Sequence, residues 1–274
     1  MEKIALVAGD TGLPDAVAQS LDAAGADFMV FPIRGHAGPE MMNRGKDNVF
    51  RIGNAAATLR KMKRLGITQI VMAGGLRRPT LREIWPSLGT LRIMIVIGLK
   101  ALRLGDDGLL SGIAQYLEKQ GMAVRGIAQV APQLITVRGE YGKYGWEKYM
   151  DDIKRGFAVA KELGRLDVGQ SVVVQQGLVL GLEGIEGTDS LIKRCGGLRR
   201  KGPGPVLVKT CKPGQDRRID LPTIGATTVL NARDAGFAGI AIEAGAAIMV
   251  DFGQMVASAD KYGLFIVGVT DEDL

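Results

Sequence analysis

The sequence has little histidine and little cysteine. His36 is the only histidine among 274 residues, and Cys195 and Cys211 are the only cysteines. One histidine excludes HExxH zinc sites and histidine-rich dimetal phosphoesterase sites, and leaves a Ser-His-Asp triad only if His36 is its base. Two cysteines are too few for a disulfide framework, so we interpret them as reduced thiols of a cytoplasmic protein. A catalytic metal would therefore have oxygen ligands, which favours Mg²⁺ or Mn²⁺.

Long apolar runs are also missing. No stretch of about 18 apolar residues exists, so we expect no transmembrane helix, and the first residues lack the features of a signal peptide. The hydrophobic content of 46% is ample for a packed core. The formal net charge of +6 suits an anionic ligand or a membrane surface without requiring nucleic acid.

Apolar strands that end in glycine turns and alternate with helices predict an α/β fold. Residues 3–8 predict a buried parallel strand that continues into the turn Gly9–Pro14, and residues 69–73 predict a strand followed by Gly74–Pro79. Two such turns facing one crevice would make a site. The first turn is not GxGxxG, and the strand 27–31 is not followed by a ribose-binding acid, so we discount a dinucleotide dehydrogenase. Phosphate contact and simple connectivity both remain open for the first turn.

The periodic pattern weakens after Met122–Ile127, and Gly139–Trp146 carries three glycines and three aromatic residues with no period. We therefore predict an N-terminal Rossmann-like α/β domain over residues 1–132, a linker over 133–148, and a C-terminal α/β catalytic domain over 149–274.

The segment Lys209–Gly225 places six charged residues between an apolar strand and a helix that we expect to begin near Thr223. Its lysines and arginines suit phosphate oxygens, while Asp216 and Asp220 could hold a divalent cation or activate water. A carboxylate just before a helix would also face amides that favour anions. The alternative is a solvated charged loop.

Two other segments allow two interpretations each. Glu183, Glu186 and Asp189 could converge on a cation or a sugar hydroxyl, or could form a turn with Thr188 or Asp189 as the helix N-cap. The apolar helix expected over Leu91–Leu104 has basic flanks, which fits either a buried core helix with snorkelling ends or contact with a membrane.

Six motifs together resemble the LpxI family. They are Ala8–Pro14, Ala73–Pro79, Gly105–Asp107, Gly164–Gln170, Glu186–Asp189 and Lys212–Gly225. The resemblance runs from Ile4 to Val269 with the motifs in matching order. It implies hydrolysis of UDP-2,3-diacylglucosamine to UMP and 2,3-diacylglucosamine 1-phosphate (lipid X) in lipid A biosynthesis, dependent on Mg²⁺ or Mn²⁺. It also implies two α/β domains with the active site in the cleft between them, and a homodimer.

The resemblance implies roles for individual residues. Asp220 matches the essential aspartate of an Arg-x-Asp-x-Pro-Thr pattern, so we predict it as the catalytic carboxylate, helped by Asp189 or Asp216, and we predict Asp220 and Asp189 as metal ligands. The predicted substrate-binding residues are Gly9, Thr11, Gly12, Leu13, Ala73, Gly74, Gly75, Arg78, Gln176, Thr188, Lys209, Lys212, Arg218 and Thr223.

A substrate with two acyl chains needs an apolar wall and an approach to the membrane. We therefore expect a peripheral protein at the cytoplasmic face of the inner membrane, with transient membrane contact and no nucleic-acid partner. Two alternatives remain open: a non-catalytic sensor that binds a UDP-sugar, and a hydrolase of another nucleotide-diphosphate substrate.

Overall fold

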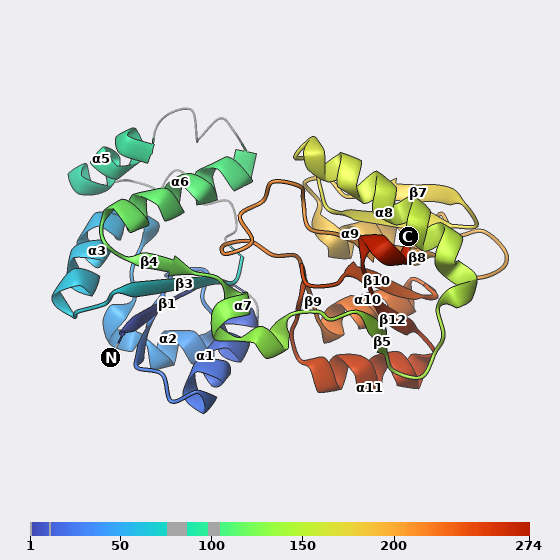
Figure 1. Ribbon diagram of the computed structural model, residues 1–274, viewed down its shortest axis with the longest axis horizontal. Coiled ribbons are helices and arrows are strands. Elements are labelled where there is room, and N and C mark those ends of the chain that lie inside the picture. Colours follow the sequence, from blue (N-terminus) through green and yellow to red (C-terminus); the bar gives the residue numbers. More distant parts are fainter. Residues whose placement is uncertain (1, 11, 76–86, 98–104) are drawn as a thin grey trace. The chain divides into compact units, whose positions relative to one another are not determined.

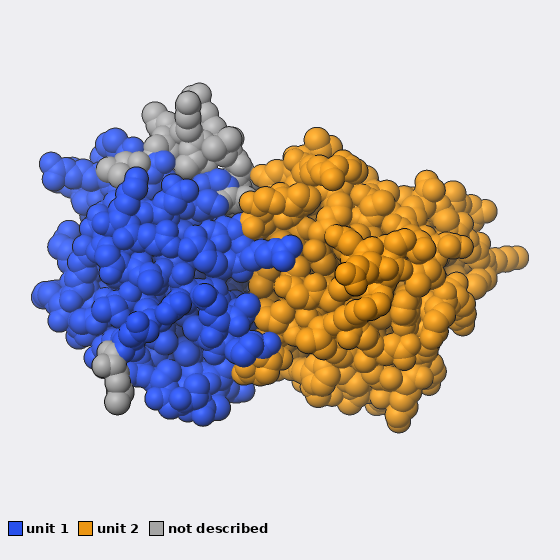
Figure 2. All heavy atoms as spheres, in the orientation of Figure 1, with its two compact units in different colours: residues 1–132, 216–220 blue, residues 133–215, 221–274 orange. Residues whose placement is uncertain are grey.

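The computed structural model describes residues 2–10, 12–75, 87–97 and 105–274 (Figure 1). These residues form two compact units, one of residues 1–132 with 216–220 and the other of residues 133–215 with 221–274 (Figure 2). The short segment 216–220 therefore belongs to the first unit, although its neighbours in sequence belong to the second. Both units combine sheets with helices, which confirms the predicted α/β class.

A parallel four-stranded sheet of order β2-β1-β3-β4 forms the centre of the first unit. Its strands are β1 (Ile4–Ala8), β2 (Phe28–Pro32), β3 (Gln69–Ala73) and β4 (Ala123–Arg125). The helices are α1 (Leu13–Ala23), α2 (Pro39–Arg44), α3 (Ala55–Arg64), α5 (Leu88–Ile97), α6 (Gly105–Lys119) and α7 (Ile127–Val130), with 3₁₀ turns η1 (Lys46–Asn48) and η2 (Ile52–Asn54). Helical crossovers between parallel strands account for the buried apolar strands.

The core of the first unit explains why residues 216–220 belong to it. Phe31, Ile70 and Val124 of the sheet are buried together with apolar side chains of α3 and α6. Ile219 packs against this cluster. Ile219 is partly buried there, and removal of its apolar surface from water anchors the segment to the first unit.

A six-stranded mixed sheet of order β5-β12-β10-β8-β6-β7 forms the centre of the second unit. Its strands are β5 (Gly139–Tyr141), β6 (Ser171–Gln175), β7 (Leu178–Leu182), β8 (Val206–Lys209), β10 (Gly239–Glu243) and β12 (Phe265–Val269). A separate parallel pair consists of β9 (Thr223–Ile224) and β11 (Ile248–Met249). The helices are α8 (Met150–Arg165), α9 (Gly187–Gly196), α10 (Ala226–Asp234) and α11 (Phe252–Tyr262), with 3₁₀ turns η4 (Pro132–Leu134), η5 (Glu147–Tyr149) and η6 (Asp271–Asp273).

Alternate residues of β8 pack on opposite faces of this sheet. Val206 and Val208 join a cluster with Phe157 of α8, whereas Leu207 joins one with Leu191 of α9 and residues of α10 and α11. The two-residue side-chain period of a strand explains how one apolar run fills two cores.

Two predicted boundaries differ from the structure. The predicted linker 133–148 contains β5, which pairs antiparallel with β12 and buries Tyr141 in the second unit's core. The helix expected near Thr223 begins at Ala226, because Thr223 and Ile224 form strand β9. Both strands are too short to produce a clear period in the sequence. Asp220 therefore precedes a strand and not a helix, so the backbone amides of a helix N-terminus do not stabilise its carboxylate as expected.

Among the described residues, no helix is both long and apolar enough to cross a membrane. Helix α5 covers part of the predicted apolar helix, and residues 98–104 of that prediction lie outside the described ranges. Leu88, Leu91 and Ile95 of α5 are exposed.

Candidate functional site

Two glycine turns of the first unit meet at the carboxyl ends of β1 and β3. The backbone nitrogen of Gly9 donates to the carbonyl oxygen of Ala73 (2.8 Å), and that of Asp10 donates to the carbonyl oxygen of Gly75 (2.8 Å). Gly74 has φ +88°, and a Cβ atom there would lie 2.3 Å from the Asp10 carbonyl oxygen. A Cβ atom on Gly9 would lie 2.6 Å from the Gly75 carbonyl oxygen. The turns approach this closely only because neither position carries a side chain.

Other predicted residues of the first turn differ in accessibility. Gly12 is exposed at the N-cap of α1, whereas Leu13 is buried in the core, so that Leu13 offers a ligand mainly its backbone. Thr11 and Arg78, both predicted to contact substrate, lie outside the described residues.

Lys209 is the last residue of β8, and its side chain is buried in the second unit. The residue is 6% exposed. Its ammonium group donates to the hydroxyl oxygen of Thr188 (2.9 Å) and to the carbonyl oxygen of Thr223 (3.1 Å). A buried charge is costly unless it is hydrogen-bonded, so these contacts hold the ends of three elements together.

Glu183 completes the group around Lys209. Its Oε1 accepts from the Thr188 hydroxyl (2.7 Å), and its Oε2 accepts from the backbone nitrogen of Gln170 (3.0 Å). Thr188 thus accepts from the ammonium group and donates to the carboxylate, which uses both functions of a hydroxyl. We call Glu183, Thr188, Lys209 and Thr223 the lysine cluster.

The three carboxylates between residues 183 and 189 do not share one role. Glu183 belongs to the lysine cluster, and Glu186 forms an ion pair with Arg194 at 2.7 Å. That pairing holds the pKa of Glu186 below its usual value. Asp189 lies exposed in the first turn of α9. Of the three, Asp189 is therefore the one placed to meet a ligand from solvent.

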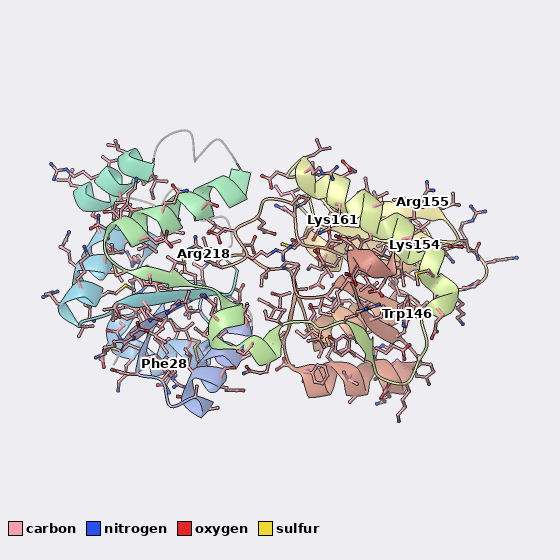
Figure 3. The ribbon with its side chains drawn as sticks, viewed as in Figure 1. Phe28, Trp146, Lys154, Arg155, Lys161 and Arg218 are labelled. Atoms are coloured by element: carbon pink, nitrogen blue, oxygen red, sulfur yellow. The ribbon has the colours of Figure 1, made fainter. Side chains whose placement is uncertain are left out.

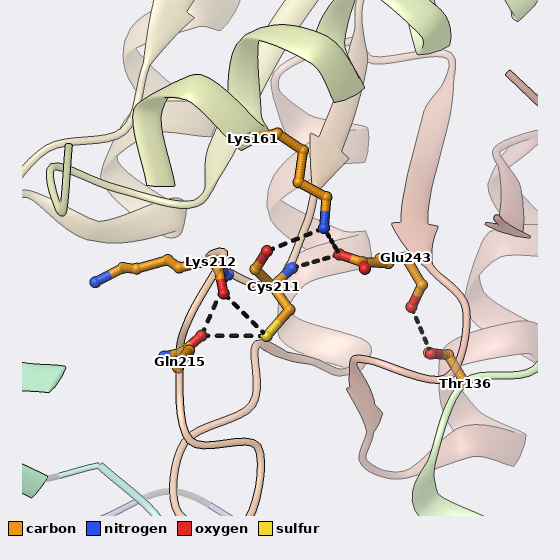
Figure 4. Close-up of polar contacts among 6 residues, drawn as sticks. All are labelled: Thr136, Lys161, Cys211, Lys212, Gln215 and Glu243. Atoms are coloured by element: carbon orange, nitrogen blue, oxygen red, sulfur yellow. Dashed lines mark hydrogen bonds and ion pairs between the residues drawn. The ribbon is translucent and has the colours of Figure 1, made fainter. Parts of the chain in front are cut away.

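A partly buried ion pair between Lys161 and Glu243 supports the loop that leaves β8. The Lys161 ammonium lies 2.6 Å from Glu243 Oε2 and 3.2 Å from the Cys211 carbonyl oxygen, and the Cys211 backbone nitrogen donates to the same Glu243 oxygen at 2.8 Å (Figure 4). Glu243 ends β10, beside β8. The pair thus fixes the backbone two residues after Lys209. Sequence reasoning missed both residues, although the position of Glu243 at the carboxyl end of a strand is a usable signal.

Two further predicted substrate-binding residues, Lys212 and Gln176, lie in different parts of the second unit. Lys212 forms an ion pair with Asp167 at 2.6 Å, next to the start of the loop. Gln176 lies in the β6–β7 turn with φ +52°. Because β6 runs antiparallel to β8, with Ser171 opposite Lys209, this turn lies at the end of the sheet away from Lys209. The structure does not bring Gln176 to the lysine cluster.

Arg218 binds two carboxylates within the first unit. Its Nε and Nη2 atoms donate to the two oxygens of Asp216 (2.9 and 2.7 Å), and its Nη1 lies 2.5 Å from an oxygen of Glu118 in α6 (Figure 3). The guanidinium holds the pKa of Asp216 below its usual value. Asp220 is half-buried, and its backbone nitrogen donates to the Asp216 carbonyl oxygen at 3.2 Å. The charges at 216 and 218 therefore order the turn that carries Asp220.

The described ranges contain no group of three or more His, Cys, Asp or Glu side chains suited to hold a metal ion. The Asp216 carboxylate already binds Arg218. Magnesium is commonly held by one or two carboxylates together with substrate phosphates and water. The described residues thus show no preformed cage for a metal ion, and the roles of Asp220 and Asp189 as metal ligands stay a prediction.

Comparison with known proteins covers the whole chain. The model of the LpxI N-terminal domain matches residues 3–134, and that of the LpxI C-terminal domain matches residues 139–267. A protein of Caulobacter vibrioides named UDP-2,3-diacylglucosamine pyrophosphatase LpxI is 36% identical over 283 residues, covering 100% of this chain and 99% of the relative. With both domain models matched in order and a full-length relative at this identity, the chain belongs to the LpxI family.

Proposed function

We propose that this protein hydrolyses the pyrophosphate bond of UDP-2,3-diacylglucosamine, giving UMP and lipid X in lipid A biosynthesis. The observation that carries the proposal is the match of both family domains, together with a full-length relative named for this activity. Glycine turns at the carboxyl ends of β1 and β3 are consistent with it, because ligands of α/β sheets bind at the carboxyl ends of the strands.

Asp220 is our proposed catalytic carboxylate, placed to accept a proton from the water that attacks phosphorus. A half-buried carboxylate in an ordered turn holds its position without losing access to water. Asp216 helps by holding Arg218, and Asp189 is the second carboxylate that we assign to the site. The placement of the reaction in a cleft between the domains stays a prediction.

Mg²⁺ or Mn²⁺ is the proposed cofactor, with Asp220 and Asp189 as its protein ligands. When bound, the ion would neutralise charge on the phosphates. Lys209 positions Thr188, next to Asp189, and so orders the first turn of α9. Arg218 and Lys212 act on phosphate only if they release the carboxylates that they bind here.

The substrate's acyl chains and its origin in a membrane lead to proposals about location. Exposed Leu88, Leu91 and Ile95 on α5 offer an apolar surface for acyl chains or the membrane. We propose peripheral association with the cytoplasmic face of the inner membrane, and a homodimer as the working assembly.

The test measures UMP release from UDP-2,3-diacylglucosamine with Mg²⁺ or Mn²⁺ and then with chelator. Wild type, Asp220→Ala and a control, Asp234→Ala, are compared. Asp234 is an exposed aspartate on α10 that pairs with its neighbour Arg233. We expect metal-dependent release by wild type and control, and a loss of at least about a thousandfold in Asp220→Ala.

Other outcomes would separate the alternatives. A folded wild type that binds the lipid without releasing UMP would favour a sensor. Preference for UDP-N-acetylglucosamine, which lacks the acyl chains, would favour a different nucleotide-diphosphate substrate. Normal turnover by folded Asp220→Ala would overturn the proposed role of Asp220.

A further inference from the structure

A cavity lies in the first unit, beside the end of the edge strand β2. It has a volume of about 520 Å³ and lies between the segment after β2, the segment before η2, and α3. Four cationic side chains line it, those of Arg34, Arg51, Lys61 and Arg64, and none of its described lining residues is acidic. The cavity shares no lining residue with the predicted site.

Backbone pairing brings two of these arginines together. Ile33 and Phe50 form an isolated parallel bridge, and the Arg34 backbone nitrogen donates to the Phe50 carbonyl oxygen at 2.8 Å. A parallel bridge places the residues that follow it, Arg34 and Arg51, beside each other. Residues far apart in sequence therefore present two like charges to one cavity.

The cations in this cavity differ from arginines elsewhere in the protein. Within the described part of the chain, the side chains of Arg34, Arg51 and Arg64 form no ion pair or hydrogen bond, whereas Arg44 pairs with Asp22 and Arg218 with Asp216. Among the residues that the structure describes, Lys61 donates only to the Asp47 backbone carbonyl oxygen.

The helix dipole accounts for only part of this arrangement. Lys61 and Arg64 lie in the last turn of α3, where the negative end of the helix favours cations. Arg34 and Arg51 come from other segments, so the dipole of α3 does not explain why they face the same cavity. Like charges held together repel, and a bound anion would remove that repulsion.

We propose that this cavity is a second ligand site, which binds a phosphate-bearing molecule through Arg34, Arg51, Lys61 and Arg64. Its volume lies in the usual range for small-molecule sites, about 300–1,000 Å³. Arginine binds phosphate oxygens in a bidentate manner, and half-buried Phe50 adds an apolar face for the rest of the ligand. The ligand is either a soluble phosphorylated molecule or the headgroup of an anionic lipid, and the proposal does not depend on the hydrolytic activity.

The test follows amide hydrogen exchange of residues 48–64 with three probes: inorganic pyrophosphate with chelator, phosphatidylglycerol vesicles and phosphatidylcholine vesicles. The cavity variant Arg51→Gln/Arg64→Gln is compared with the control Lys154→Gln/Arg155→Gln, which removes two exposed cations from α8 in the other unit (Figure 3). Both variants lose the same charge, so a difference between them reports the cavity and not the net charge.

We expect an anionic probe to protect residues 48–64 in the wild type and in the control. In the cavity variant the apparent affinity should fall by at least about tenfold, as expected for the loss of charge-assisted hydrogen bonds. Protection by pyrophosphate identifies a soluble ligand, and protection by phosphatidylglycerol alone identifies a lipid headgroup. Absence of protection with every probe, equal protection by phosphatidylcholine, or equal weakening in both variants would overturn the proposal.

Discussion

The ammonium nitrogen of Lys209 lies 2.9 Å from the hydroxyl oxygen of Thr188, which connects the end of β8 to the first turn of α9. The same hydroxyl donates to buried Glu183, so one threonine stands between a buried cation and a buried anion. Because Asp189 follows Thr188 directly, this contact fixes the backbone from which the exposed Asp189 carboxylate extends.

A double-mutant cycle measures this relationship. Lys209→Met should lower kcat/KM by about a hundredfold, and Thr188→Val by about tenfold, because each removes part of one hydrogen-bonded unit. The double variant should be little worse than Lys209→Met, since the same contact is lost. Steady-state kinetics on all four proteins gives the coupling, and strictly additive losses would show that Lys209 and Thr188 act independently.

The Lys161–Glu243 pair should contribute strongly to stability. Glu243→Gln removes the charge that faces Lys161, whose side chain is 21% exposed, and should cost about 2–3 kcal/mol in the free energy of unfolding. The matched control is Glu162→Gln, which breaks an exposed pair with Arg165 and should change stability by less than about 0.5 kcal/mol. Urea denaturation measures both, and equal effects would contradict the role of Glu243.

Glycine-to-alanine substitutions test the two turns of the first unit. Gly9→Ala should cost about 1–3 kcal/mol because its Cβ atom would overlap the Gly75 carbonyl oxygen, and Gly74→Ala should cost at least as much because φ is +88°. Gly75→Ala is the control, since a Cβ atom there has no neighbour within 4 Å among the described atoms. Thermal or urea unfolding should show a near wild-type stability for Gly75→Ala and a lower stability for Gly9→Ala and Gly74→Ala.

Acid should weaken the turn that carries Asp220. Arg218 lowers the pKa of Asp216 in the folded protein. The stabilisation by the Asp216–Arg218 pair is therefore fully present above the pKa of Asp216 in the unfolded chain, about 3.9. It is lost as the pH falls through the lower pKa of the folded protein. Asp216→Asn should therefore reduce stability at about pH 7 and flatten the stability curve below about pH 4. The control is Asp151→Asn, at an exposed position on α8. A similar acid dependence in Asp216→Asn and wild type would argue against the pairing.

Both cysteines should be protected in the folded protein. Cys195 is 0% and Cys211 1% exposed, and burial raises the pKa of the Cys195 thiol, which keeps it protonated. Reaction with a thiol reagent should be at least about a hundredfold slower in native protein than in urea. Rapid labelling of either thiol under native conditions would show that its surroundings open readily.

Local patterns in the sequence predicted much of the framework. The predicted strand 69–73 coincides with β3, and the predicted strand 3–8 contains β1. Very short strands were harder to predict. Strand β5 has three residues, and its partner β12 lies more than a hundred residues away in sequence. A periodic signal cannot arise from so few residues.

The candidate site was predicted in composition more than in arrangement. The cations of the loop after β8 were predicted to suit phosphate oxygens, and the structure adds that Lys212 and Arg218 bind carboxylates and that Lys209 is buried in the lysine cluster. Sequence spacing gives no information on which opposite charge lies nearby after folding. Lys161 and Glu243, 82 residues apart, illustrate the same limit.

The sequence by itself determined the α/β class, the glycine turns after β1 and β3, the exclusion of HExxH and histidine-rich dimetal sites, and the family resemblance. These depend on local patterns and on the kinds of side chain present. Only the tertiary structure decided that residues 216–220 pack with the first unit, that Thr188 connects Glu183 to Lys209, and that Arg34 and Arg51 share a cavity. The physical reason is that buried ion pairs, core packing and cavities join residues that are distant in sequence.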